Sequence, residues 1–383
     1  MSFNGPIFAV NLQRYRALYN IDPEHLAARA GLSSVRLALL MAGQKEPTGA
    51  EVLIFSDIFL CDYNDLISDK LPSSIILLEE FFKKYTNIND EDRINILEFL
   101  FLSECQDFLD PPTPFDRQNL IVNFKKFSAI YKEDEVKAAQ ELRLFFNYKT
   151  NEIKINVFND FRQIGLTVWR RRLDNSHISS LYIQGPASRP SILVNYAKDV
   201  FSQRFATAFA VGRTLGADGP DNDLFYDGSL KEPQDNLVNQ RANKFALEFL
   251  VPKDFLSKIP HNTQWAKDKI IKYSKNALVN PLNFLDALFN AHLISKEDKN
   301  LYSNLEIANE EKIDPEFIAE ASPELKERKL YFLQRGLSSD YVSLGFKAYR
   351  NQLISAGKLT EMLLCNEPNE LWEISKLYHE NLD

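Results

Sequence analysis

The residues best suited to reading another molecule lie at the start of one short helical stretch and just beyond it. They combine a guanidinium, hydroxyls, an amide and an ammonium group, which are the groups that contact base edges and phosphates in DNA. Arg36 can bridge a guanine edge, Ser34 can reach a base or a phosphate, and Val35 can pack on a thymine methyl group. The candidate positions are Ser33, Ser34, Val35, Arg36, Gln44 and Lys45.

Two features of this region argue against DNA binding. After Arg36 the stretch becomes continuously apolar, and Leu39 and Ala42 stand where a DNA-reading helix is usually polar. Residues 1–68 carry five basic and seven acidic side chains, a balance of −2, whereas phosphate contacts require positive charge. A dimerisation or docking unit that keeps the fold without binding DNA is therefore the alternative interpretation.

Capping and turn residues predict the elements that hold these side chains. Asp22 is a good N-cap with Pro23 at the first helical position, and Gly31 is a typical stop. Short helices separated by such tight turns are what a helix-turn-helix needs. We expect helices over 7–19, 23–31 and 33–42, and a fourth after Pro47.

This pattern resembles a known DNA-binding family. Residues 22–43, DPEHLAARAGLSSVRLALLMAG, are similar to the XRE-type (lambda-repressor-like) module, with its Leu-Ala-x-x-x-Gly-Leu-Ser turn and following recognition helix. The stretch PTGAEVLIFSDIFLCDYNDLI resembles the closing helix of that module. The resemblance covers about 60 residues and implies operator binding as a homodimer.

Two later stretches share the frame of a second family. RFATAFAVGRTLG (204–216) resembles the zinc helix Arg-Phe-Thr-Leu-Ala-His-Glu-Leu-Gly-His of ImmA/IrrE-type metallopeptidases. RANKFALEFLVP (241–252) resembles the family signature Ala-Asn-x-Phe-Ala-x-x-Leu-Leu-x-Pro. The resemblance implies a zincin-like domain with a short sheet, joined to the helix-turn-helix as in fused bacterial regulator–peptidases.

The catalytic groups of that family are missing here. A zinc helix needs two His residues one turn apart and a Glu between them, which takes a proton from the bound water. Phe209, Ala210 and Arg213 stand at those places, and none of them can bind zinc or act as the base. The family's third ligand is a Glu shortly before the Ala-Asn pair, where this chain has Asn239, Gln240 and Arg241. We therefore expect no metal, no cofactor and no hydrolysis.

The vacated zinc site has two interpretations. In the first it binds a protein partner or a small ligand, with positive charge from Arg204, Arg213, Arg241 and Lys244 offered to an anion. In the second, which apolar spacing favours, Phe205 and Phe209 fill the space and the cations pair with nearby acids or stay in solvent.

Composition narrows the class of protein. The 383 residues are 45% hydrophobic and 26% charged, with a net charge of −8, as in ordinary globular proteins rather than broadly basic nucleic-acid binders. No apolar run is long enough for a membrane span, the start does not read as a secretory signal, and the three cysteines are far apart. These features predict a cytoplasmic protein.

The remaining segments predict a mainly α chain with a small α+β domain. Strands are expected in GLTVWRRRL, ISSLYIQG and SILVNYA, followed by helices over 199–216 and 235–250. Arg170, Arg171 and Arg172 have two interpretations, a phosphate-contacting edge or, as we expect, an exposed edge strand protected by charge. The expected domains are 1–68, 69–129 (helical, ending near the DPPTP break), 130–255 (peptidase-like) and 256–383 (helical).

Together these inferences favour a non-catalytic transcriptional regulator of a bacterium or mobile element. It would bind operator DNA through its N-terminal module, and its degenerate peptidase-like domain would serve for sensing or assembly. The alternative is an antitoxin-like or inhibitory protein-interaction module.

Overall fold

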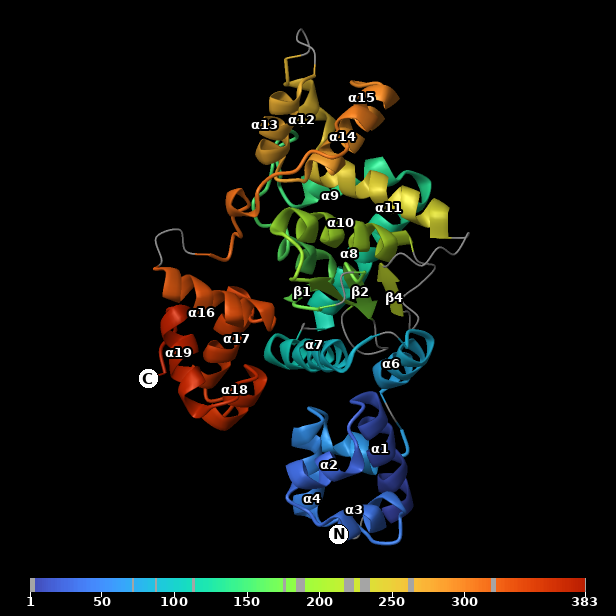
Figure 1. Cartoon of the computed structure of the whole chain (residues 1–383), viewed down its shortest axis with the longest axis vertical. Coiled ribbons are helices and arrows are strands. Elements are labelled where there is room, and N and C mark those ends of the chain that lie inside the picture. The colour runs from blue at the N-terminus through green and yellow to red at the C-terminus, as the bar shows by residue number, and fades with distance from the viewer. Residues whose placement is uncertain are drawn as a thin grey trace.

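The computed structural model describes residues 4–382 except 71, 87, 112–113, 175–176, 184–189, 217–223, 228–234, 261–264 and 318–321. The chain is mainly helical with one small mixed sheet, as its sequence predicts (Figure 1). Among the described residues, no helix is both long enough and apolar enough to cross a membrane.

The first four helices are confirmed, and their boundaries follow from the predicted caps. The Asp22 carboxylate accepts the backbone N–H of His25 at 2.9 Å, and Gly31 ends the helix with a φ of +64°, which glycine adopts without strain. Ser33 caps the next helix by accepting from the backbone N–H of Arg36. The helices are α1 (Gly5–Leu18), α2 (Pro23–Ala30), α3 (Ser34–Met41), α4 (Gly49–Ile58) and α5 (Tyr63–Ile67).

Two helices join this N-terminal bundle to the rest of the chain. They are α6 (Ser73–Lys84) and α7 (Asp90–Leu109). Arg14 of α1 pairs with Glu79 of α6 at 2.7 Å, and the Asn20 side-chain amide donates to Asp90 of α7 at 2.7 Å. The next helix, α8 (Pro114–Glu133), runs unbroken through the domain boundary predicted at residue 129.

The three expected strands are confirmed, and a fourth completes the sheet. They are β1 (Thr167–Arg171), β2 (Ser180–Ile183), β3 (Ser191–Asn195) and β4 (Leu224–Asp227), in the order β1-β3-β2-β4. β1 runs parallel to β3, in register from Thr167 opposite Ser191, whereas β2 is antiparallel to both β3 and β4.

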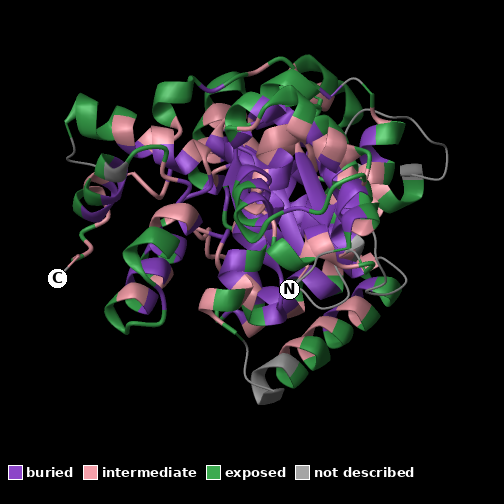
Figure 2. Cartoon of the chain, turned by 90° about the horizontal axis from the view of Figure 1, so that it is seen from below, coloured by how far each residue is buried: buried purple, intermediate pink, exposed green. Residues whose placement is uncertain are grey.

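Helices cover both faces of the sheet, and buried residues gather around it (Figure 2).

The remaining elements are helical. Between α8 and the sheet lie α9 (Glu135–Phe145) and a 3-10 turn over Asp160–Ile164. After the third strand come α10 (Val200–Gly216), α11 (Asp235–Leu250), α12 (Lys253–Ser257), α13 (Lys267–Ala277), α14 (Pro281–Asn290) and α15 (Lys296–Leu301). After a 3-10 turn over Asn309–Glu311 come α16 (Pro323–Gln334), α17 (Ser339–Arg350), α18 (Ala356–Met362) and α19 (Pro368–Leu377).

The sheet separates two hydrophobic cores. Trp169, Leu181 and Leu193 face a core shared by the N-terminal bundle, α6, α7 and α16–α19. Ile192 and Val194 face a core shared by α8–α14. The helices after residue 255, expected as one C-terminal domain, therefore divide between the two cores.

The prediction that Arg170 and Arg171 lie at an exposed edge is wrong. Both are buried, because their guanidinium groups find carboxylates from distant segments. Arg170 binds Asp314 through both terminal nitrogens and donates to Gln203 of α10 at 2.8 Å. Arg171, only 1% exposed, pairs with Glu98 of α7 and donates to the backbone oxygen of Arg335 at 2.9 Å. Only Arg172, just beyond the strand, lies in solvent.

We expect Arg171→Ala to lower the free energy of unfolding by about 3 kcal/mol, because it leaves the Glu98 carboxylate without its buried partner. Urea denaturation followed by tryptophan fluorescence measures the loss. The matched control is Arg172→Ala, whose side chain is 54% exposed and whose loss should stay within about 0.5 kcal/mol. Equal effects of the two substitutions would contradict this role for Arg171.

Candidate functional sites

The third helix lies at the end of the molecule farthest from α12–α15, on the outer side of the N-terminal bundle (Figure 1). Leu37 and Leu40 anchor it in the bundle core. Ser34 is exposed at its start, as is Val35, with 71% of its surface accessible. The outward positions beyond them are Ala38, Ala42, Gln44 and Lys45. This face is small and mostly uncharged, with the Lys45 ammonium at its edge.

Arg36 differs from the other predicted DNA-contacting residues, because its side chain turns toward α4. Its Nε and Nη2 atoms each donate to one carboxylate oxygen of Glu51 at 2.7 Å, and Nη2 also donates to the Glu46 backbone oxygen at 3.0 Å. Glu51 also accepts from the backbone N–H of Thr48 at 2.7 Å, in a capping box. The Thr48-x-x-Glu51 spacing in the sequence could have predicted the capping box, but not the pairing of Glu51 with Arg36.

These contacts fix the ionisation of Glu51. The hydrogen bonds from Arg36, supported by those from Thr48, lower the pKa of Glu51 to about 2. Both side chains therefore remain charged at neutral pH, and the Arg36 guanidinium is occupied within the bundle rather than offered to a base.

The predicted zinc-site positions on α10 lie in the core. Phe209 and Ala210 are buried in the core of α8–α14, and Phe209 stacks on Phe205 with ring centres 6.3 Å apart. Arg204 is also buried, and its guanidinium donates to the backbone oxygens of Leu278 and Ile155. The aromatic pair therefore fills its surroundings, and Arg204 holds loops together.

The helices α10 and α11 touch closely at a glycine. A Cβ atom added at Gly212 would lie 3.0 Å from Cδ1 of Phe245 and 3.2 Å from Cα of Ala242. The absence of a side chain at Gly212 thus sets the separation of these helices.

Most of the polar side chains near the contact between α10 and α11 form hydrogen bonds or ion pairs with other residues of the chain. Arg241 donates to the Glu135 carboxylate at 3.0 Å and to the backbone oxygen of Tyr131, and Lys244 pairs with the same carboxylate at 3.4 Å. Arg213 is half-buried and also interacts with neighbouring groups. Asn239 keeps a buried Oδ1 atom that no described residue hydrogen-bonds.

In the described part of the chain, no group of three or more His, Cys, Asp or Glu side chains is arranged to hold a metal ion. The paired cations and the buried aromatic residues agree better with a filled site than with an open anion pocket.

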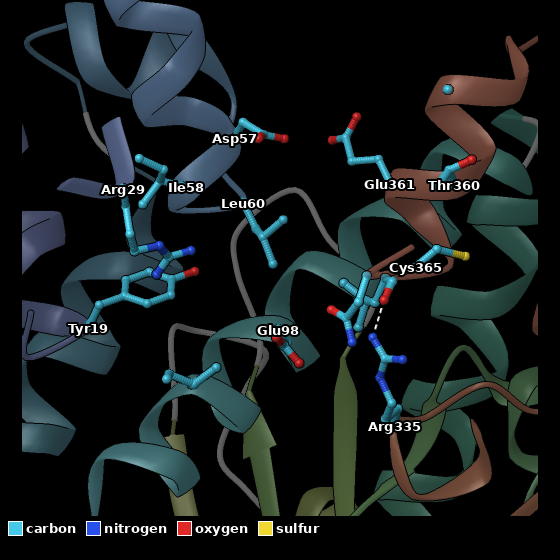
Figure 3. Close-up of a pocket in the computed structure, with 14 residues that line it drawn as sticks. Tyr19, Arg29, Asp57, Ile58, Leu60, Glu98, Arg335, Thr360, Glu361 and Cys365 are labelled. Carbon is cyan, nitrogen blue, oxygen red and sulfur yellow. Dashed lines mark hydrogen bonds between the residues drawn. The ribbon is translucent and has the colours of Figure 1, made fainter. Parts of the chain in front are cut away.

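A cleft of about 390 Å³ lies between the N-terminal bundle and the C-terminal helices (Figure 3). Tyr19, Asp57 and Leu60 form the wall on the bundle side, and Glu98 of α7 lies at the base. Glu361 and Cys365 belong to the opposite wall. No sequence signal pointed to this cleft, because its walls come from opposite ends of the sequence.

The two walls of the cleft are not joined by an ion pair in the described residues. Asp57 and Glu361 point toward one another across it, and like charges disfavour closing the gap (Figure 3). Glu361 pairs with Lys358 on its own helix, at 2.7 Å. Arg335 donates to the Leu364 backbone oxygen on the same side. The bundle is held instead through α6 and α7.

No family model, curated protein or solved structure matches this chain.

We expect Gly212→Val to destabilise the α10–α11 pair by about 2 kcal/mol, because the new methyl groups must push against the Ala242 backbone. Thermal denaturation followed by circular dichroism provides the comparison. Gly49→Val is the control, since nothing lies within 4 Å of a Cβ atom at Gly49. Equal stability of the two variants would show that the helices tolerate separation.

We expect the N-terminal bundle to lose stability as pH falls from about 4.5 toward 2. The pKa of Glu51 is lower in the folded chain than in the unfolded chain, so its contribution is complete above the unfolded value and disappears as the folded chain is protonated. This loss of stability is measured by hydrogen exchange of the backbone amides of α3 and α4 as a function of pH. Glu51→Gln should remove part of the dependence, whereas Glu46→Gln, an exposed carboxylate nearby, should retain it. An unchanged profile for Glu51→Gln would refute the assignment.

Proposed function

We propose that this chain is a non-catalytic transcriptional regulator that binds operator DNA through α3. The observation that carries the proposal is the arrangement of α2, the Gly31 turn and α3, with the start of α3 exposed at the outer end of the molecule (Figure 1). A helix held in this way can enter a major groove while the preceding helix crosses the backbone. The XRE-type resemblance of residues 22–43 supports the same function.

In this proposal the candidate residues contact different parts of the DNA. Ser34 and Val35 are free to meet base edges, and Gln44 and Lys45 to meet phosphates. Arg36 positions the turn after α3 through Glu51 and is not a base contact in this proposal. Specificity would then rest on a small apolar face, and affinity on few positive charges.

The ImmA/IrrE-like part serves the regulator as a scaffold in this proposal. Its support is the burial of Phe209 and Ala210, together with the in-chain partners of Arg204 and Arg241. Since Phe209, Ala210 and Arg213 cannot transfer a proton, regulation in this proposal comes from binding. The cleft beneath the N-terminal bundle is the place where a bound molecule would change how the bundle sits on α7.

A protein-interaction module remains the second candidate, and one observation favours it. Apolar side chains are exposed on two neighbouring helices of the bundle: Val35 on α3, and Leu53, with 60% of its surface accessible, on α4. Such residues are common where a protein meets a partner or a second copy of itself.

DNA binding is tested by fluorescence anisotropy with a labelled duplex from upstream of the gene. Wild-type affinity should fall as salt rises from about 50 to 200 mM, because binding releases counterions. Lys45→Glu should weaken binding and reduce the salt slope by about 1. Lys296→Glu makes the same charge change on α15, at the opposite end of the molecule, and should have no effect (Figure 1).

Absence of binding at about 50 mM salt, or equal effects of Lys45→Glu and Lys296→Glu, would exclude specific DNA contact by α3. The interaction candidate predicts instead that Leu53→Glu abolishes a stoichiometric complex with a protein partner. Sedimentation of the full chain with and without DNA distinguishes the two and reports whether it is a homodimer.

A further inference from the structure

A cavity of about 190 Å³ lies between α16 and α19, in the C-terminal group of helices. Leu325, Leu377 and Phe317 give it an apolar lining, and Lys329 forms part of its wall. Cavities near 150 Å³ with apolar walls hold a benzene ring, so this one has room for a small ring or a short aliphatic chain. This cavity is separate from α3, from α10 and α11, and from the cleft beneath the N-terminal bundle.

The Lys329 ammonium is buried without a counter-ion. Its side chain is only 5% exposed. Nζ donates one long hydrogen bond, 3.4 Å, to Ser339 Oγ, and lies 3.0 Å above the centre of the Tyr378 ring. No described carboxylate forms an ion pair with it. The ring and the Ser339 hydroxyl, which in turn donates to Glu316, compensate this charge in part, but no described carboxylate contacts the ammonium directly.

The carboxylates that act on Lys329 from a distance are engaged elsewhere. Asp314 is bound by Arg170 and by the Tyr196 hydroxyl, the latter at 2.8 Å. Glu316 accepts from the backbone N–H and hydroxyl of Ser339, at 3.2 and 2.6 Å. Glu316 is thus linked to Lys329 only through the Ser339 hydroxyl, and Asp314 is paired with Arg170.

Burial lowers the pKa of Lys329 to about 8, and the amine is still mainly protonated at pH 7. Burying an unpaired charge is costly, and proteins normally supply a partner. Since no described side chain supplies one, an anion inside the cavity is the group that would complete the site.

The surroundings favour an anion over a neutral ligand. Lys326 and Lys376 lie at the cavity and add positive charge. Arg328 is neutralised by Glu373, to which it donates at 2.6 Å, so that pair contributes little net charge. Two further cations beside a buried ammonium attract a negative group to this cavity.

We propose that the cavity between α16 and α19 binds a small organic carboxylate, with its apolar body against Leu325 and Leu377 and its carboxylate paired with Lys329. The ammonium favours an anion, and the apolar lining favours an apolar body. An inorganic anion satisfies only the first requirement and an uncharged aromatic alcohol only the second. The inference holds whether or not α3 binds DNA.

Isothermal titration calorimetry of the full chain tests this with three probes: benzoate, benzyl alcohol and inorganic phosphate. Benzoate should bind with a Kd below about 1 mM, and the other two at least about tenfold more weakly. Lys329→Met keeps the shape of the side chain and removes the charge. It should weaken benzoate binding at least about tenfold and leave benzyl alcohol unchanged.

Two further variants keep the test decisive if Lys329→Met fails to fold. Leu325→Trp, at a half-exposed position, should fill the cavity and abolish benzoate binding. Lys296→Met, on the distant α15, should bind benzoate like the wild type. The proposal is overturned if benzoate shows no binding up to about 10 mM, if benzyl alcohol binds as tightly, or if Leu325→Trp binds benzoate normally. None of these readouts involves DNA.

Discussion

The structure depends on two neighbouring arginines that leave one strand in opposite directions. Successive side chains of a strand point to opposite faces, so Arg170 and Arg171 reach different layers from adjacent positions on β1. Arg170 holds the segment around Asp314, and Arg171 holds α7 through Glu98. Burying a guanidinium is costly unless most of its donors are satisfied, so each arginine requires a particular neighbour, although Nε of Arg171 has no partner among the described residues. The sheet edge thereby ties together segments that share no local sequence signal.

Other arginines of this chain are used in the same way. Arg36 holds the turn before α4, Arg204 holds two loops, and Arg241 holds the end of α8. Each is in a position where the sequence alone suggests an external ligand. A guanidinium group that is hydrogen-bonded to carboxylates or carbonyl oxygens within the fold is not available to bind an external ligand. Two lysines differ from these arginines in their surroundings. Lys45 lies in solvent, and Lys329 is buried beside a cavity.

The sequence correctly predicted features that depend on residues close together in the chain. It did not predict features that depend on contacts between distant segments. The caps at Asp22 and Ser33 give the boundaries of α2 and α3, because a cap depends on residues three positions away. The fate of Arg171 could not be predicted in this way, since Glu98 lies 73 positions from it along the chain. The split of the C-terminal helices between two cores was missed for the same reason, because amphipathic patterns show that a helix has an apolar face but not which face it meets.

The division into two cores has a consequence for how the protein forms during synthesis. The core of α8–α14 is built from consecutive segments, and it can close once these have left the ribosome. The core on the other face needs the N-terminal helices and α16–α19, so it stays incomplete until translation has passed α19. Until then Trp169 lacks its contact with Tyr341, and this face of the sheet is covered only by the helices that precede it. The nascent chain therefore carries a partly uncovered apolar sheet face while the second half of the chain is synthesised, which is the kind of surface that chaperones bind.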